Sequence, residues 1–225
     1  RMGDLLARLL GRVDVCIISG GQIGQFMSQV VDNLPELDEE AWHRLHLMPT
    51  CGTQYYRYRD GWQLVYAENL SEEEKAAALA AVERAAKDLD LWETDTWGPI
   101  LEDRGSQITF SALGQSAPVA AKMAWDPDGT KKNRLREAIA EQLPSLEVRS
   151  GGSTSIDITR QGIDKAYGMR KLAEVTGIPL DDMLFVGDRL DPQGNDYPVK
   201  ALGVACHAVT GWEDTAVFLE DWLRQ

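Results

Sequence analysis

The chain has 225 residues, of which 44% are hydrophobic, and its formal net charge at pH 7 is −13. This composition supports a full core in one large domain or two modest ones, and so acidic a chain is not expected to bind nucleic acid or an anionic membrane. Its three cysteines show neither metal-ligand spacing nor a disulfide framework. Without a signal peptide or a membrane-length apolar segment, the sequence predicts a cytoplasmic protein.

The first part of the chain predicts helices that alternate with strands. Residues 2–10 carry leucines at helical spacing, and residues 13–18 form an apolar run that is typical of a buried strand. A second helix is expected after the serine and two glycines at residues 19–21. Asp38 is expected to cap a further short helix that runs through His46.

The middle part predicts an antiparallel sheet with helices on one face and a polar surface on the other. A hairpin centred on residues 60–61 precedes a helix that begins at the capping box of residues 71–74. The later segments alternate apolar and polar side chains, as strands with one covered face do. Strands are expected over residues 107–112, 146–149 and 155–159, and a helix over residues 131–143.

The last part again alternates helix and strand, which predicts a parallel sheet. A helix is expected from Asp164 to a stop at Gly177, followed by a strand that ends at residue 187. The predicted fold class is therefore α/β, with a Rossmann-like parallel-sheet core and an inserted α+β domain. The expected core comprises residues 1–68 and 160–225, and the insertion comprises residues 69–159.

An acidic loop follows the last of the predicted buried strands. Asp188 ends the apolar run, and a six-residue loop then brings in Asn195 and Asp196. In open α/β sheets, ligands bind beyond the carboxyl ends of the strands. Three oxygen donors at that edge suit Mg²⁺, which keeps the rest of its shell for water and phosphate. The alternative interpretation is a plain strand followed by an acidic turn.

Two other positions suit an anion. Ser19 and Gly20 lie where the first predicted strand ends and a helix is about to begin, so a hydroxyl and free N–H groups come together. Lys165 lies on the first turn of a helix, against the helix dipole, which is tolerable if its ammonium meets a phosphate and carboxylates. The alternatives are an ordinary Gly-rich turn and a solvated surface lysine.

The predicted insertion carries hydroxyl groups and a carboxylate on one sheet. Ser155, Asp157 and Thr159 share one strand face at a period of two, and the polar residues of the 107–111 segment share another. Such a face suits hydrogen bonding to a sugar. The alternative is a face that simply meets water, as one side of many antiparallel sheets does.

Together these residues resemble the haloacid dehalogenase superfamily of phosphotransferases. The likeness is to the branch with an α/β cap, the Cof-type and phosphomannomutase-like proteins, and it is closest to the eukaryotic-type phosphomannomutases. It covers almost the entire chain and implies a core of that superfamily's type with an inserted cap. The motifs that carry it are Gly187-Asp188 with Asn195-Asp196, Gly151-Gly152 before Ser155-Ile156-Asp157, Gly162 through Lys165, and Arg104-Gly105.

The resemblance implies a role for each group of residues. The transferring phosphoryl group would be bound by Ser19 and Lys165, with Gly20 beside them in substrate binding. The sugar phosphate would be held on the cap by Arg104, Ser155 and Asp157. Mg²⁺ would be held or oriented by Asp188, Asn195 and Asp196.

The implied activity is Mg²⁺-dependent phosphoryl transfer through a phospho-aspartate, as a phosphatase or as a phosphohexomutase. A homodimer formed through the cap is a further implication.

The sequence departs from this family at two places. The nucleophile motif Asp-x-Asp-x-Thr is absent, and we expect the chain to start roughly 25 residues too late to contain it, so no nucleophile is assigned. Gln115 stands where phosphomannomutases carry a basic residue, which weakens the case for holding a second phosphate. Phosphatase and mutase therefore both stay open, and the alternative from another class is a non-catalytic sugar-phosphate binder or regulatory remnant.

Overall fold

The computed structural model describes residues 1–224, and they divide into two compact units. The first unit comprises residues 1–67 together with the chain from residue 163 onwards, and the second comprises residues 68–162. Each unit has its own clusters of buried apolar side chains. The second unit is continuous in sequence and interrupts the first.

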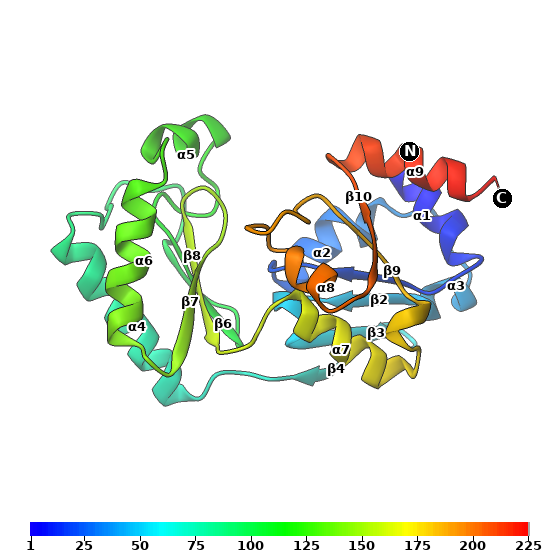
Figure 1. Ribbon diagram of the computed structural model, residues 1–225, viewed down its shortest axis with the longest axis horizontal. Coiled ribbons are helices and arrows are strands. Elements are labelled where there is room, and N and C mark those ends of the chain that lie inside the picture. Colours follow the sequence, from blue (N-terminus) through cyan, green and yellow to red (C-terminus); the bar gives the residue numbers. More distant parts are fainter. Residues whose placement is uncertain (225) are drawn as a thin grey trace. The chain divides into compact units, whose positions relative to one another are not determined.

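The first unit contains two separate sheets (Figure 1). In the larger sheet β1 pairs with β2 in parallel, whereas β2–β3 and β3–β4 are antiparallel. In the smaller sheet β9 and β10 are parallel. The strands of the larger sheet are β1 (Val15–Ile18), β2 (Leu45–Met48), β3 (Gln54–Tyr58) and β4 (Trp62–Ala67), and those of the smaller sheet are β9 (Leu184–Gly187) and β10 (Ala205–Ala208).

Helices cover both faces of these sheets. Leu45 and Leu47 of β2 pack with side chains of α1, α2 and α3, whereas Met48, which points to the opposite face, packs with Leu172 of α7. Helix α9 packs on α1, and α8 packs with α7 against β9. These helices are α1 (Met2–Leu10), α2 (Ile23–Gln29), α3 (Glu39–His43), α7 (Lys165–Thr176), α8 (Tyr197–Ala201) and α9 (Trp212–Trp222), and the 3₁₀ turns are η1 (Val31–Asn33), η2 (Thr50–Gly52) and η3 (Leu180–Asp182).

The second unit is one antiparallel sheet with the order β5–β6–β8–β7. Helices α4 and α6 lie on one face of it (Figure 1), where Ile108, Phe110 and Ile158 are fully buried. This arrangement follows the alternation of apolar and polar side chains along the strands. The elements are α4 (Glu72–Asp88), β5 (Leu101–Asp103), β6 (Gln107–Ser111), α5 (Val119–Trp125), α6 (Thr130–Gln142), β7 (Leu146–Ser150) and β8 (Ser155–Arg160).

Several helix ends follow their sequence signals. The Ser71 hydroxyl accepts a hydrogen bond from the Glu74 N–H, and the Asp164 carboxylate accepts one from the Tyr167 N–H. Gly177 ends α7 with a φ of 74°, a left-handed conformation that favours glycine. The short elements β5, α5 and α8 carry weaker signals and were not predicted. No helix among residues 1–224 is long and apolar enough to cross a membrane.

The prediction of a helix through His46 is wrong. Asp38 caps α3 as expected, by accepting a hydrogen bond from the Ala41 N–H, but the helix ends at His43. Residues 45–48 instead form β2 and are buried on both faces. Pairing with β1 and β3 on either side outweighs the local preference, because a short apolar run does not distinguish a strand from a buried helix.

Close backbone contact fixes the start of α7 against the larger sheet. Gly52 of η2 and Gly168 of α7 face each other, and a Cβ placed on Gly168 would lie 2.7 Å from the Cys51 carbonyl oxygen and still closer to the Ile18 side chain. Only glycine permits this approach. It places the first turn of α7 beside the carboxyl end of β1.

We therefore expect Gly168→Ala to lower the free energy of unfolding by about 1–3 kcal/mol, because the added methyl group overpacks this contact. Urea unfolding followed by circular dichroism measures the change. Gly24→Ala is the control, since a Cβ on this helical glycine meets nothing within 4 Å. An equal loss of stability in both variants would contradict the close contact.

Candidate functional site

A buried ion pair joins the start of α7 to the loop after β9. The Lys165 Nζ lies 2.5 Å from Asp196 Oδ1. The Asp196 side chain is only 1% exposed and that of Lys165 is 14% exposed, so both charges are largely removed from water. The other carboxylate oxygen, Oδ2, accepts a hydrogen bond from the Arg189 N–H at 3.0 Å. Asp196 thus ties Lys165 to the peptide that follows Asp188.

Two glycines make room for this arrangement. A Cβ on Gly187 would lie 2.5 Å from Asp196 Oδ2, so the carboxylate rests directly on the end of β9. Gly194 approaches the backbone of Arg189 too closely for a side chain, and the Asp196 N–H donates to the Arg189 carbonyl at 3.1 Å. The loop therefore folds back to the strand end, as its sequence predicted. Asp188 and Asn195 are exposed there.

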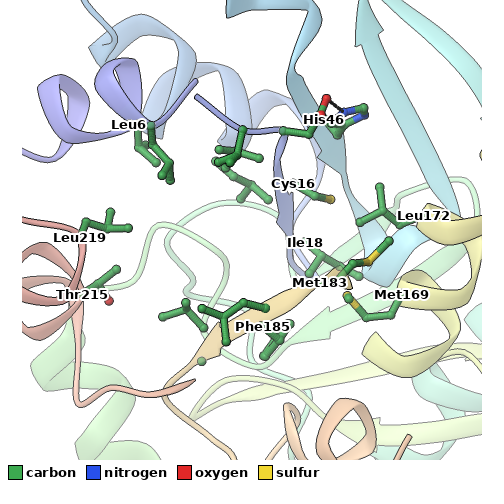
Figure 2. A pocket seen from close by; sticks show the side chains of 18 of the residues that line it. Leu6, Cys16, Ile18, His46, Met169, Leu172, Met183, Phe185, Thr215 and Leu219 are labelled. Atoms are coloured by element: carbon green, nitrogen blue, oxygen red, sulfur yellow. Dashed lines mark hydrogen bonds and ion pairs between the residues drawn. The ribbon is translucent and has the colours of Figure 1, made fainter. Parts of the chain in front are cut away.

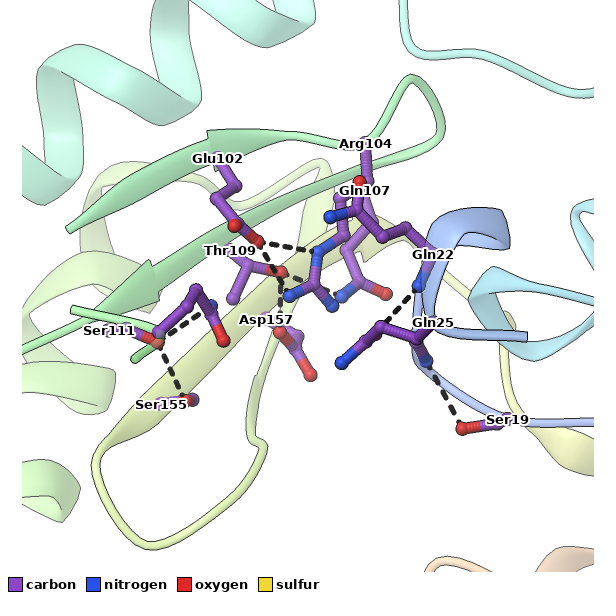
Figure 3. Close-up of polar contacts among 12 residues, drawn as sticks. Ser19, Gln22, Gln25, Glu102, Arg104, Gln107, Thr109, Ser111, Ser155 and Asp157 are labelled. Atoms are coloured by element: carbon purple, nitrogen blue, oxygen red, sulfur yellow. Dashed lines mark hydrogen bonds and ion pairs between the residues drawn. The ribbon is translucent and has the colours of Figure 1, made fainter. Parts of the chain in front are cut away.

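Ser19 lies at the carboxyl end of β1. Its Oγ accepts a hydrogen bond from the Gly21 N–H at 3.2 Å, and its carbonyl accepts one from the Cys51 N–H. Helix α2 begins only at Ile23, and the Gln22 N–H already donates to the Gln25 side chain, as Figure 3 shows. The N–H groups of Gly21 and Gln22 thus both donate within the chain.

The ends of β1 and β9 flank the same turn of α7. Ile18, just before Ser19, has its side chain against Gly168, one turn after Lys165. Gly187, just before Asp188, lies against the Asp196 carboxylate that binds Lys165. The core residues predicted for phosphate and metal binding therefore gather at one edge of the first unit.

The donors at this edge suit a hard cation. Across residues 1–224, no group of three His, Cys, Asp or Glu side chains is arranged to hold a metal ion. Asp188, Asn195 and Asp196 offer two carboxylates and one amide, all of them oxygen donors, and two of the three side chains are exposed. Such a set fits Mg²⁺ in its usual state, with few protein ligands and several waters.

The polar face of the second unit is a chain of hydrogen bonds (Figure 3). Gln107 Nε2 donates to Thr109 Oγ1, which donates to Asp157 Oδ1, both at 2.8 Å. Beside them, the hydroxyl groups of Ser111 and Ser155 are 3.0 Å apart. The three β6 side chains are at most 2% exposed, whereas Ser155 and Asp157 of β8 are half-buried.

The cationic groups of this face are paired with carboxylates. Arg104 donates through Nε and Nη2 to Glu102 Oε2, at 3.0 and 2.7 Å. Arg149 lies within 2.9 Å of Glu147. The sequence analysis assigned Arg104 to the substrate but missed Glu102, although a carboxylate two residues before the arginine was a visible signal.

Gln115 completes the polar network of this unit. Its side-chain Nε2 donates to Ser111 Oγ at 2.8 Å, and its backbone carbonyl oxygen accepts a hydrogen bond from Lys122 Nζ at 3.0 Å. The side chain of Gln115 thus binds a hydroxyl group of the sheet, and its backbone binds the nearby lysine. The sequence analysis noted Gln115 only because phosphomannomutases carry a basic residue at this position.

Burial raises the pKa of Asp157 above its ordinary value, against the hydrogen bond from Thr109. When the pKa of an acid is higher in the folded than in the unfolded state, the folded protein binds the proton more tightly. The free energy of unfolding then falls as the pH rises through that pKa. We therefore expect Asp157→Asn to be at least as stable as the parent at pH 7. The difference should shrink as the pH falls through the raised pKa of the parent carboxyl, which then becomes protonated. Urea unfolding across this pH range measures it.

Asp128→Asn serves as the control of opposite sign. A hydrogen bond from the Thr130 N–H lowers the pKa of this exposed carboxyl, so its loss should reduce stability at pH 7. If Asp157→Asn loses stability in the same way at neutral pH, burial is not the dominant effect at Asp157.

Comparison with known proteins gives a consistent set of relatives. A model of the haloacid dehalogenase-like hydrolase family matches residues 108–198, a segment that includes Asp157, Lys165 and the loop after β9. A phosphomannomutase of Encephalitozoon cuniculi is 26% identical over 208 residues, which cover 88% of this chain and 76% of that protein.

Two solved structures show the same fold. The IMP-nucleotidase of Plasmodium falciparum, in an N-terminally truncated, IMP-bound form, aligns with a TM-score of 0.67 and 12% identity. The alignment covers the whole chain but only 62% of the nucleotidase. A haloacid dehalogenase-like hydrolase from Bacteroides thetaiotaomicron aligns with a TM-score of 0.61 and 15% identity, over 98% of this chain and 91% of that one.

Proposed function

We propose, because the chain is a relative of the haloacid dehalogenase-like hydrolases and a distant homologue of the phosphomannomutases, that it works in Mg²⁺-dependent phosphoryl transfer on a small phosphorylated sugar. The observation that carries this proposal is the Lys165–Asp196 pair at the end of β9, beside Asp188. It presents an ammonium group and an exposed carboxylate at the strand edge where α/β proteins bind their ligands.

In this proposal Lys165 and Ser19 bind the transferring phosphoryl group. The overall charge of −13 repels anions, so a phosphate ester needs a local cation. Lys165 supplies one that Asp196 holds in a fixed position, and the Ser19 hydroxyl can donate to a phosphoryl oxygen. Gly20, with no side chain, leaves the backbone open to the ligand.

The metal would be held by Asp188, Asn195 and Asp196. Bound Mg²⁺ would neutralise charge on the phosphoryl oxygens and orient the group for in-line transfer. Asp196 has a second role, because its hydrogen bonds to Lys165 and to the Arg189 N–H keep the ammonium and the Asp188 peptide together. The preorganised charge lowers the barrier without rearrangement during the reaction.

The covalent step needs a nucleophilic carboxylate, and no residue of the sequence is assigned to it. In the proposed reaction this carboxylate forms a bond to phosphorus while the bond from phosphorus to the sugar oxygen breaks. The sugar oxygen takes a proton from a general acid, to which no residue of the sequence is assigned either. Water then cleaves the phospho-aspartate and releases inorganic phosphate in a phosphatase.

The second unit would bind the sugar. Its face of Ser155, Asp157 and neighbouring hydroxyl groups offers donors and acceptors that match a polyol, and Arg104 would bind near them. Because Arg104 and Arg149 are each paired with a glutamate, this face has little positive charge left for a second phosphate. The pairing favours a phosphatase over a mutase, which must hold that second phosphate as the sugar reorients.

The test of this function is an assay of the protein made from the complete reading frame, supplied with mannose 1-phosphate, Mg²⁺ and a sugar bisphosphate activator. We expect inorganic phosphate as the product. Mannose 6-phosphate would instead show a mutase, and saturable binding by calorimetry without either product would show a sugar-phosphate binder.

The metal and phosphate roles have a separate test. We expect Asp188→Ala to abolish Mg²⁺-dependent turnover and to weaken Mg²⁺ binding in calorimetry, and Lys165→Ala to reduce turnover by about 100-fold. Lys200→Ala is the matched control, because this lysine is exposed on α8. Unchanged Mg²⁺ affinity in Asp188→Ala would contradict the metal assignment.

A further inference from the structure

The turn between β2 and β3 has an unusual backbone. Thr50, Cys51 and Gly52 have φ angles of 49°, 57° and 89°, so three consecutive residues lie in the left-handed region. Glycine adopts this conformation readily, whereas it is costly for a residue with a Cβ and most costly for a β-branched one such as threonine. In the described part of the chain, the other two non-glycine residues with a positive φ are Asp60 and Asp90, and aspartate tolerates this conformation.

Hydrogen bonds from side chains hold this turn in place. The Thr53 hydroxyl donates to the Thr50 carbonyl at 2.9 Å, and the two hydroxyl groups are 2.6 Å apart. The Tyr66 hydroxyl of β4 donates to the Gly52 carbonyl at 2.8 Å. Both threonines are only 1% exposed, so their bonds form away from water, where losing them would leave buried polar groups without partners. A strained backbone persists only where its surroundings fix it in this way.

The turn binds the loop that follows β1 through two successive N–H groups. The Thr50 N–H donates to the Gly21 carbonyl at 3.0 Å, and the Cys51 N–H donates to the Ser19 carbonyl at 2.9 Å. Successive N–H groups of an extended strand point to opposite sides, so a turned backbone is needed for both to reach one loop. The two bonds fix the carbonyl groups before and after Gly20, and a Cβ on that glycine would lie 3.9 Å from Cys51 Sγ. The turn thus determines where the loop lies.

The same turn packs against α7. A Cβ on Gly52 would lie 2.5 Å from the Gly168 Cα, and one on Gly168 would lie 2.7 Å from the Cys51 carbonyl oxygen. Ile18, at the end of β1, packs against the cluster that includes Met169 of α7, and Figure 2 shows both side chains. The backbone of Cys51 therefore binds the loop after β1 through its N–H group and contacts α7 through its carbonyl group.

We propose that Cys51 is a positioning residue of the phosphate site, and that its left-handed backbone sets the distance between the Ser19 hydroxyl and the Lys165 ammonium. This inference rests on the proposed function, in which the two groups bind one phosphoryl group. The Gly21 N–H holds the Ser19 Oγ within the loop at 3.2 Å. Lys165 lies on the first turn of α7, three residues before Gly168. The contacts of the turn thus reach both sides of the phosphate site.

The strain at this turn has a reason under the proposal. Ser19 follows β1 and Lys165 begins α7, so the two groups come from distant parts of the sequence. Donors stabilise a transferring phosphoryl group best when they are held in the right geometry before it binds. One residue that contacts both segments through its backbone fixes that geometry. The proposal therefore predicts that the φ preference of residue 51, and not its thiol group, decides phosphate binding.

The experiment compares two substitutions of similar size at this position. Cys51→Val disfavours the left-handed conformation because valine is β-branched, whereas Cys51→Asn tolerates it. With Mg²⁺ present, we expect Cys51→Val to bind inorganic phosphate about 10-fold more weakly than the parent, the effect of one lost hydrogen bond to a charged group. Cys51→Asn should stay within about twofold of the parent, because its backbone keeps the left-handed conformation. NMR titration of the Gly20 and Gly21 amide signals measures the affinity and locates the anion.

Asp60→Val is the matched control for the general cost of such a substitution. Asp60 has a φ of 52° and lies in the exposed turn between β3 and β4, so valine there meets the same backbone conflict. We expect this variant to lose stability as Cys51→Val does, with unchanged phosphate affinity.

Hydrogen exchange of the Thr50 amide provides a second measurement, because this N–H binds the Gly21 carbonyl. We expect it to exchange about 10-fold faster in Cys51→Val than in Cys51→Asn, since the loop and the turn then separate more often.

Weaker phosphate binding in Cys51→Val alone supports the positioning role. Equal binding by the parent and all three variants overturns that role and leaves the proposed function intact. Equal weakening in Cys51→Asn overturns it as well, because crowding or loss of the thiol group is then the cause, and so does equal weakening in Asp60→Val. If the parent binds no phosphate at residues 19–21, the positioning role and the proposed function are both wrong. Should Cys51→Val fail to fold, the β-branched but polar Cys51→Thr replaces it with the same expectations.

Discussion

The buried pair of Lys165 and Asp196 is the interaction on which the organisation of the candidate site depends. Removing two charges from water is costly, and the attraction between them offsets that cost only when further hydrogen bonds satisfy the remaining atoms. Here the second oxygen of Asp196 accepts the Arg189 N–H, so the carboxylate has partners on both sides. The pair holds a helix terminus, a strand end and a loop in one arrangement, and an alternative position of any one would leave a buried charge unpaired.

This local arrangement matters because the chain as a whole is strongly acidic. The general field disfavours anions, and a phosphate ester would be attracted only where cations are held close together. Both units pair these cations with carboxylates. Lys165 is paired with a carboxylate that also packs on the strand edge, and Arg104 donates through two nitrogens to one oxygen of Glu102. The first pair lies at a strand end beside the exposed Asp188, and the second lies on a polar sheet face.

The features that sequence analysis predicted correctly are local in sequence. The capping residues Ser71 and Asp164, and the return of the 189–196 loop to the end of β9, depend on side chains within a few positions of one another. The errors concern partners distant in sequence. His46 lies in a strand because β1 and β3 pair on either side of it, and no pattern within residues 38–48 contains that information.

The same limit applies to the sheet. The sequence predicted one parallel sheet because strand and helix alternate, and parallel pairing is present in both sheets of the first unit. Their separation could not be read from the pattern, because an apolar run looks the same whether one or both of its edges are paired.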